Sequence, residues 1–412
     1  MHRGRQARRL ALHGLPRRSI AQLHRWSGLV TMACLVVASL TGVWLVFRSE
    51  LDRMLSPHLR VVRPGATRVP SDDVVSRVER AFPDARVTLL GAQARPDDAI
   101  LVSVRPRGSE PLDFDQVFVD PYKGEILGTR TTSLVSVTRA SLDSLMLGLH
   151  YSLLLDTPGI WIMGTAAVVW LLTSILGVAL AWPGGWWRPA SWKAVLSART
   201  SDGAYKANYN LHRAAGLCFL PVTTVLAFTS FALNLPQYVR PVVHRLSPLT
   251  RQPAGHTVPA ERTRVSFGDA ETIVANAVPA SRTSSTYRDL TNGRYSVHFR
   301  LPGDVNPRGD NFAFVDVETG ALTGVRRPSR LRAGDRFMSW LFPLHTGAAF
   351  GLPGRIMVAL SGVAMVVLNA TGLYVWWTKW RMRRRQHAHR GAVGPAQNVS
   401  RRPSLSERGS AG

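Results

Sequence analysis

The chain has few acidic residues and almost no cysteine. It holds 26 Asp and Glu against 51 Lys and Arg, which gives a formal net charge of +25. Cys34 and Cys218 are its two cysteines and lie in long apolar stretches, so the polar segments must fold without disulfides. The sequence has no phosphate loop, dinucleotide fingerprint or nucleophile elbow. A redox enzyme with this sequence must therefore receive electrons from a partner.

Charge is also missing from four long stretches of the sequence, residues 29–47, 157–187, 214–239 and 356–378. A helix needs about 20 apolar residues to cross a bilayer. We predict a membrane-helical fold with four transmembrane helices, at residues 23–48, 157–183, 209–236 and 353–378. The lipid bilayer is thus an expected partner of the chain.

The positive charge is concentrated beside these stretches. Residues 1–22, the connector 184–208 and the tail 379–412 are basic. Basic flanks mark the cytoplasmic side of a membrane protein. We expect a multi-pass protein of the bacterial inner membrane with both termini cytoplasmic, and a disordered tail. Because topology accounts for the charge, no nucleic-acid partner is expected.

Residues 49–140 and 237–334 would then face the periplasm. Each segment has one stretch of helical spacing, Ser71–Phe82 and Phe267–Val278, followed by short strand patterns. We predict a small α+β unit with its own antiparallel sheet in each segment, and we interpret Asp120 and Asp316 as turn formers. The apolar segments that follow, residues 141–156 and 335–352, are either interfacial helices or the first turns of the next span.

The most informative feature is an internal repeat. Copies of the same motifs recur in the same order, 188 to 196 residues apart. The recurring motifs are His24-Arg25 with Gly28, matched by His212-Arg213 with Gly216; Phe118-Val119-Asp120, matched by Phe314-Val315-Asp316; and Leu149-His150 with Pro158-Gly159, matched by Leu344-His345 with Pro353-Gly354. The four membrane helices would therefore arise from a two-fold repeat.

The repeat places four histidines in two possible pairs. His24 and His212 lie at the cytoplasmic ends of their spans, and His150 and His345 lie at the exported ends. The hydrocarbon core is about 30 Å thick, so ligands at opposite ends cannot share one ion. Pairing is possible only between His24 and His212 and between His150 and His345.

Two opposed imidazoles can hold a haem iron from both faces, which suits electron transfer. Gly28 and Gly216 lie one turn after their histidines and would let a flat macrocycle approach the helix. Arg25 and Arg213 could pair with haem propionates. We therefore expect two haems with the four histidines as axial ligands.

Simpler interpretations of these residues remain open. An interfacial histidine is often an amphipathic anchor, a glycine in a span is often a packing contact, and a flanking arginine often sets topology alone. Copper or zinc at either pair is another alternative, although two histidines make a poor cage for either ion.

The sequence resembles the PepSY-associated transmembrane-helix family. The resemblance rests on Leu23–Leu29 and its copy Leu211–Leu217, on Gly-Leu-Pro-Gly at 351–354, and on Thr371–Trp377. It covers residues 18–382 and makes the exported units similar to PepSY domains. It implies an iron-regulated inner-membrane protein that reduces ferric siderophore iron in the periplasm with b-type haem. The electron donor would be cytoplasmic or a quinol.

Two alternatives to siderophore reduction follow from the same features. The exported units could bind a periplasmic peptide, protease or transporter, with the spans serving only as anchors. Alternatively, the protein could pass electrons to a periplasmic redox protein. One departure from the repeat bears on siderophore reduction. Gly354-Arg355 stands where the first half has Gly159-Ile160. We expect from this asymmetry that only one of the two outer sites meets substrate.

Overall fold

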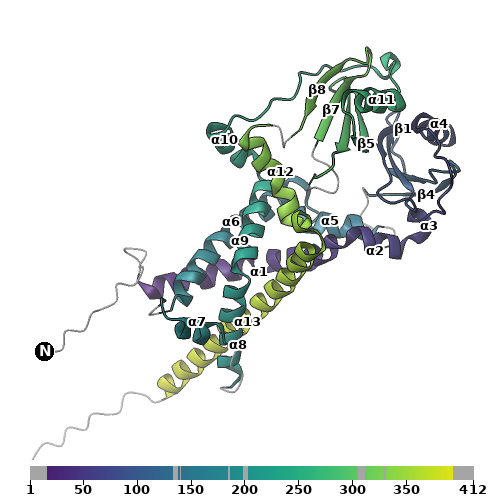
Figure 1. The fold of residues 1–412 in the computed structure, drawn as a ribbon. Helices are drawn as coiled ribbons and strands as arrows, with labels where there is room; N and C mark the ends of the chain where they lie inside the picture. Colours follow the sequence, from purple (N-terminus) through teal and green to yellow (C-terminus); the bar gives the residue numbers. More distant parts are fainter. Residues whose placement is uncertain are drawn as a thin grey trace, which may run out of the picture.

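Long apolar helices form one end of the molecule, and a β-sheet forms the other (Figure 1). The computed structural model describes residues 16–132, 138–139, 141–183, 186–197, 203–304, 311–327 and 331–392. Within these ranges, three unbroken helices have the length and composition to cross a membrane. They are α1 (Arg17–Val46), α6 (Asp156–Ala181) and α13 (Gly351–Ala392).

The predicted third span, residues 209–236, is broken. It consists of α8 (Ala204–Cys218) and α9 (Leu220–Asn234), which meet at 68°. Pro221 lies in the first turn of α9 and lacks the N–H that a continuous helix would use. The structure therefore divides the predicted helix of residues 209–236 into two helices at Phe219. The described residues thus hold three unbroken candidate spans, and a fourth if the bent pair α8 and α9 forms one span.

Short helices connect the spans to the sheet. The segments that were predicted as interfacial helices or span starts form helices separate from the spans, α5 (Leu142–Ser152) and α12 (Ala333–Thr346). The tail remains helical to Ala392 as part of α13, and its residues 393–412 lie outside the described ranges. The remaining short helices are α2 (Arg48–Leu55), α3 (Pro57–Arg60), α7 (Pro189–Leu196), α10 (Pro236–Leu246), η1 (Ala260–Arg262) and η3 (Ala348–Phe350).

The two repeats share a single antiparallel sheet of eight strands. Its order is β4-β3-β2-β1-β5-β6-β7-β8, so each repeat supplies one half. The strands are β1 (Ala85–Gly91), β2 (Ile100–Pro106), β3 (Gln116–Val119), β4 (Ile126–Arg130), β5 (Arg282–Asp289), β6 (Arg294–Arg300), β7 (Asn311–Asp316) and β8 (Leu322–Arg326).

Strands β1 and β5 join the two halves. Leu89 pairs with Tyr287, Leu90 with Thr286, and Gly91 with Ser285. Two separate units would each leave β1 or β5 as an unpaired edge, which is prone to pair with another strand. The prediction of two separate sheets was therefore wrong, because the halves complete each other.

The hydrophobic core also crosses this junction. Helices α4 (Ser71–Ala81) and α11 (Phe267–Ala277) form where the helical spacing predicts them and pack beside each other. Val74 and Val78 of the first repeat belong to the same buried cluster as Phe267 and Tyr295 of the second. The sheet and these two helices thus form one domain, called the sheet domain below.

Asp120 and Asp316 act as turn formers, as the sequence indicates. The carboxylate of Asp120 accepts hydrogen bonds from the backbone N–H groups of Tyr122 and Lys123. Asp316 accepts the equivalent bonds from the second repeat. Each turn ends on a glycine with positive φ, 70° at Gly124 and 73° at Gly320. Glycine adopts this conformation without the steric cost of a Cβ atom.

Candidate functional site

The structure brings both predicted histidine pairs together. His24 on α1 and His212 on α8 have ring centres 6.3 Å apart, at 79° to each other. His150 on α5 and His345 on α12 have ring centres 6.0 Å apart, at 62°. We call the first the tail-side pair, because it lies towards the chain ends, and the second the sheet-side pair. Each pair takes one imidazole from each repeat.

These separations match two imidazoles on one metal ion. Two metal–nitrogen bonds of about 2.0 Å plus two ring radii place the ring centres roughly 6 Å apart. Edge-to-face packing of aromatic rings gives a similar distance, about 4.5–7 Å. The distance alone therefore does not distinguish a ligand pair from a packing contact, but the hydrogen bonds of the rings do.

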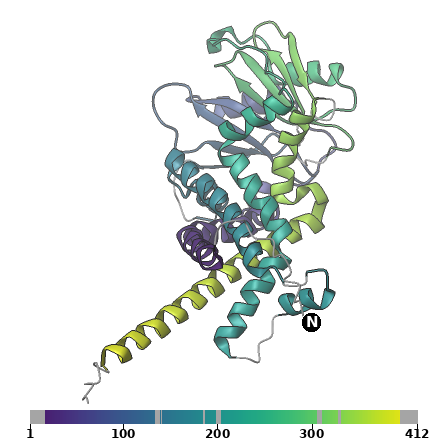
Figure 2. The same ribbon diagram turned by 90° about the vertical axis from the view of Figure 1, so that its left-hand side faces the viewer.

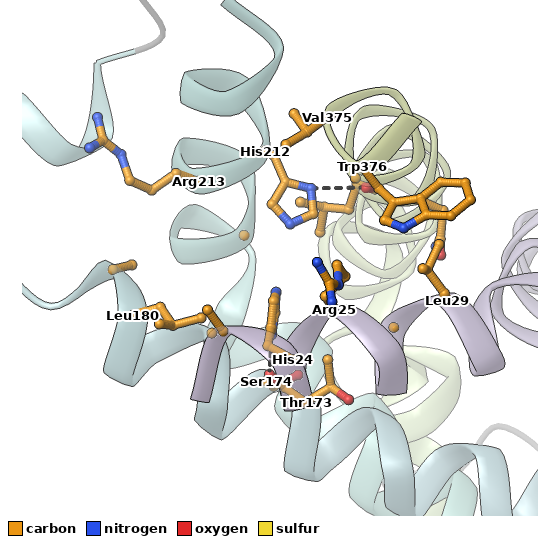
Figure 3. Close-up of a pocket in the computed structure, with 18 of the residues that line it drawn as sticks. His24, Arg25, Leu29, Thr173, Ser174, Leu180, His212, Arg213, Val375 and Trp376 are labelled. Carbon is orange, nitrogen blue, oxygen red and sulfur yellow. Dashed lines mark hydrogen bonds between the residues drawn. The ribbon is translucent and has the colours of Figure 1, made fainter. Parts of the chain in front are cut away.

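In the tail-side pair, both rings are held through Nδ1 by backbone carbonyls. His24 Nδ1 lies 3.0 Å from the carbonyl oxygen of Thr173. His212 Nδ1 lies 3.0 Å from the carbonyl oxygen of Leu368 and 3.1 Å from the Thr371 hydroxyl. Figure 3 shows the two imidazoles entering the same space from α1 and α8.

In the sheet-side pair, threonine hydroxyls bond to the Nδ1 atoms of both histidines. His150 Nδ1 lies 3.0 Å from the carbonyl oxygen of Ala38 and 3.0 Å from the Thr41 hydroxyl. His345 Nδ1 lies 3.0 Å from the Thr229 hydroxyl. Every holding residue belongs to the same repeat as the histidine that it holds, whereas each pair joins the two repeats.

These bonds fix which nitrogen carries the proton. A carbonyl oxygen can only accept, so Nδ1 of His24, His150 and His212 must donate. The Nε2 atom then keeps its lone pair for a ligand. Metal-binding histidines are commonly held in this way through their second nitrogen. A packing contact requires no such arrangement, so the geometry favours ligand pairs.

Sequence reasoning missed the four threonines that lie beside the histidines. Each is preceded by a valine four residues earlier and donates its hydroxyl to that valine's carbonyl, at 2.6 to 2.8 Å. The hydroxyl oxygen is then oriented to accept. The signal was present as Val-x-x-x-Thr followed by Gly or Ser in four apolar stretches: Val37/Thr41, Val169/Thr173, Val225/Thr229 and Val367/Thr371.

Glycines lie directly against three of the rings. A Cβ atom added at Gly177, Gly372 or Gly42 would approach Cε1 of His24, His212 or His150 to 3.1 Å. The predicted glycines Gly28 and Gly216 have a different environment. A Cβ added at Gly28 would meet no atom within 4 Å, and one at Gly216 would meet Leu368 at 3.6 Å.

A cavity of about 630 Å³ surrounds the tail-side pair and is bordered by Gly28 and Gly216. This volume falls in the range of cofactor sites, about 300–1,000 Å³. Its walls include apolar side chains such as Leu35 and Met365. Its lining holds no Asp or Glu among the described residues but six cations: Arg17, Arg18, Arg25, Arg213, Lys379 and Arg383. Such a cavity suits a flat apolar ligand that carries negative charge at one edge.

The two predicted arginines have different surroundings. Arg25 lies beside the imidazoles of the tail-side pair, whereas Arg213 extends away from them (Figure 3). Arg213 donates to the carbonyl oxygen of Ala194 at 3.1 Å. The Nε atoms of both are buried without a hydrogen-bond partner. Arg25 is therefore better placed than Arg213 to bind an anionic group in the cavity.

Close backbone approaches at two glycines, called the glycine corners below, position the sheet-side pair. A Cβ on Gly159 would overlap the carbonyl oxygen of Ser152, two residues after His150. A Cβ on Gly354 would overlap the carbonyl oxygen of Gly347, two residues after His345. The recurring Pro-Gly motifs thus allow the close corners from which both histidines project.

Arg355, the residue that breaks the repeat, is engaged in the protein. Its guanidinium donates to Glu50 at 2.8 and 2.9 Å and to the carbonyl oxygen of Val46 at 2.7 and 3.0 Å. It thereby connects the start of α13 to the end of α1. The expectation that this asymmetry selects one outer site for substrate stays a prediction. The contacts of Arg355 give it a structural role.

The site holds pairs and not larger ligand groups. In the part of the chain that the structure describes, no three His, Cys, Asp or Glu side chains gather as a metal cage. The residues fit a ligand that needs protein atoms at only two coordination positions, which is the case for haem iron.

Long apolar helices, two pairs of facing histidines and a shared sheet domain define a helical membrane protein built from two repeats. The chain belongs to the family described as the PepSY-associated TM region, whose model matches residues 21–379. The curated proteins include no match to this chain.

Proposed function

We propose that this protein is an inner-membrane electron carrier that holds two b-type haems and reduces the iron of ferric siderophores in the periplasm. The observation that carries the proposal is the arrangement of the histidines. Two opposed pairs have ring centres 6.3 and 6.0 Å apart, and each ring is anchored through Nδ1.

The residues of the tail-side site match the shape and charge of haem. His24 and His212 would be its axial ligands, and Gly28 and Gly216 leave space for the ring. Arg25 supports the binding of a propionate, since its Nε is buried without a partner. A haem held by two imidazoles supplies one-electron chemistry without an open position for oxygen.

At the sheet-side site, His150 and His345 would hold the second haem. They lie on the helices that directly follow the two halves of the sheet, α5 after β4 and α12 after β8. This supports a route in which electrons enter at the tail-side pair, from a cytoplasmic or quinol donor, and leave beside the sheet domain. Siderophore oxygen ligands prefer Fe(III) to the softer Fe(II), so reduction would weaken the complex.

The proposal is tested on the full chain purified in detergent. We expect reduced-minus-oxidised spectra of b-type haem that disappear when all four histidines are replaced. The reduced protein should then be reoxidised by a ferric hydroxamate or catecholate chelate. A folded protein without haem absorption would contradict the haem assignment. Reoxidation only by a redox protein would support the haem assignment and contradict the ferric siderophore as substrate.

A further inference from the structure

The four histidines differ in what holds their Nδ1 atoms. His24, His150 and His212 each lie 3.0 Å from a backbone carbonyl oxygen. His345 differs, because among the described residues its Nδ1 partner is the Thr229 hydroxyl. The tail-side pair therefore has two carbonyl acceptors and the sheet-side pair has one.

The backbone carbonyl that would match those of the other repeat positions does not bond to His345 among the described residues. In α1 and α13, the carbonyl three residues before the threonine is the acceptor, at Ala38 and Leu368. The matching residue in α9 is Leu226. Its carbonyl accepts from the Thr229 hydroxyl at 3.1 Å, as the carbonyls of Ala38 and Leu368 accept from their threonines at 3.3 and 3.2 Å, but no bond from His345 reaches it in the described part of the chain. Thr229 also donates to Val225 at 2.8 Å and is 1% exposed. Its oxygen is thus fixed in place to accept from His345.

The acceptor at Nδ1 controls how strongly an imidazole donates electrons to a metal. A hydrogen bond from Nδ1 raises the basicity of the ligand, and an amide carbonyl is a stronger acceptor than an alkyl hydroxyl. A more basic ligand favours the ferric state and lowers the reduction potential. The hydrogen bonds around the axial ligands are among the protein's means of tuning a haem.

We propose that Thr229 is a positioning residue for His345 and that its hydroxyl, in place of a carbonyl, gives the sheet-side site a higher reduction potential than the tail-side site. This inference rests on the proposed haem binding. It gives the electron path a direction, from the tail side to the sheet side, that arises from the protein's own hydrogen bonds.

Thr229→Val tests the inference, and Thr41→Val is its matched control. Both residues are buried, both hold a sheet-side histidine, and both donate to a valine carbonyl four residues earlier. Only His150 keeps a carbonyl acceptor when its threonine is lost. Potentials and electron paramagnetic resonance spectra of the oxidised, full-length protein are measured for each variant.

We expect Thr229→Val to shift the sheet-side equilibrium toward the reduced form by up to about tenfold, which is about 59 mV for one electron. Its low-spin signal should also change, because the ring of His345 loses its fixed orientation. Thr41→Val should shift the potential less, and Thr229→Ser should restore the wild-type values. Equal shifts in both valine variants, or none in Thr229→Val, would overturn the inference.

A second measurement covers the case in which Thr229→Val does not fold. The wild-type protein should show two potentials, and His24→Leu, which disrupts the tail-side site, should retain the higher one. Retention of the lower potential would refute the assignment. A wild-type protein without haem would instead refute the proposed function, so the two failures are distinguishable.

Discussion

The two repeats are nearly equivalent in the sheet domain but differ in the membrane helices. In the sheet, each repeat supplies four strands in mirrored order and one covering helix. Among the helices, α1 is continuous over Arg17–Val46, whereas its counterpart is bent by 68° between α8 and α9. Figure 2 shows the sheet domain at one end of the molecule and α13 extending from the other.

The comparison shows that the geometry of the histidine pairs is kept while their surroundings change. Both pairs have nearly the same ring separation, although one lies in a cation-lined cavity and the other at two glycine corners. If both pairs hold haem as proposed, sites with the same ligands and different surroundings can differ in affinity and potential.

The largest effect is expected from removing one pair. His24→Ala or His212→Ala should reduce the haem content from two to one per chain, because the tail-side site loses an axial ligand. Pyridine haemochrome absorbance per mole of protein measures the content. His58→Ala, at an exposed position on α3, is the control and should keep both haems. Loss of both haems in the tail-side variants would show that the sites are not independent.

A glycine corner provides the next test. In Gly159→Ala, the methyl group would overlap the carbonyl of Ser152, and the corner after His150 must open. Strain of this kind typically costs about 1–3 kcal/mol, and we expect a lower melting temperature and a weakened sheet-side haem signal. Gly108→Ala, outside both histidine sites, meets no atom within 4 Å and should leave the protein's stability unchanged. Similar melting temperatures for the two variants would contradict the role assigned to the corner.

The junction of the two sheet halves can be weakened selectively. Asp72 on α4 accepts hydrogen bonds from the Ser266 hydroxyl at 2.8 Å and the backbone N–H of Gly268 at 2.9 Å. Asp72→Ala should lower the free energy of unfolding by about 1–3 kcal/mol, since it leaves partly buried donors unpaired. Asp73→Ala removes an exposed carboxylate from the same helical turn and serves as the control in urea denaturation.

The smallest effect concerns the pH dependence of the second half of the sheet. Burial lowers the pKa of His298, whose ring lies 4.3 Å from that of Phe312. Below pH 6.5 the unfolded chain binds a proton more readily than the folded chain, so the contribution of His298 to stability decreases as the pH falls. His298→Gln should reduce the loss of melting temperature between pH 7.5 and 5.5. An unchanged pH dependence would contradict the assignment.

Much of the sheet domain could be predicted from local pattern. The spacing of Val74, Val75 and Val78 predicted α4, and the alternation over Arg294–Arg300 predicted β6 with the observed bounds. Strand β5 was missed because Arg282–Asp289 is polar and gains its place by pairing with β1. Pairing between repeats is a long-range property that no local pattern contains.

For the candidate site, the repeat identified the four histidines and both pairings. The threonines that hold them were missed because threonine in an apolar helix commonly bonds to its own backbone. Their role becomes visible only when α5 packs on α1 and α12 packs on α9. The bend at Phe219 was missed although the sequence contains Pro221. A proline does not by itself predict a break, because packing can also accommodate it within a continuous transmembrane helix.

A cryo-electron microscopy map of the purified full-length protein tests the central claim most directly. We predict a planar macrocycle between His24 and His212 and another between His150 and His345, with Nε2 of each imidazole directed at the central iron. Side chains of the paired histidines in direct contact, without density between them, would contradict this account.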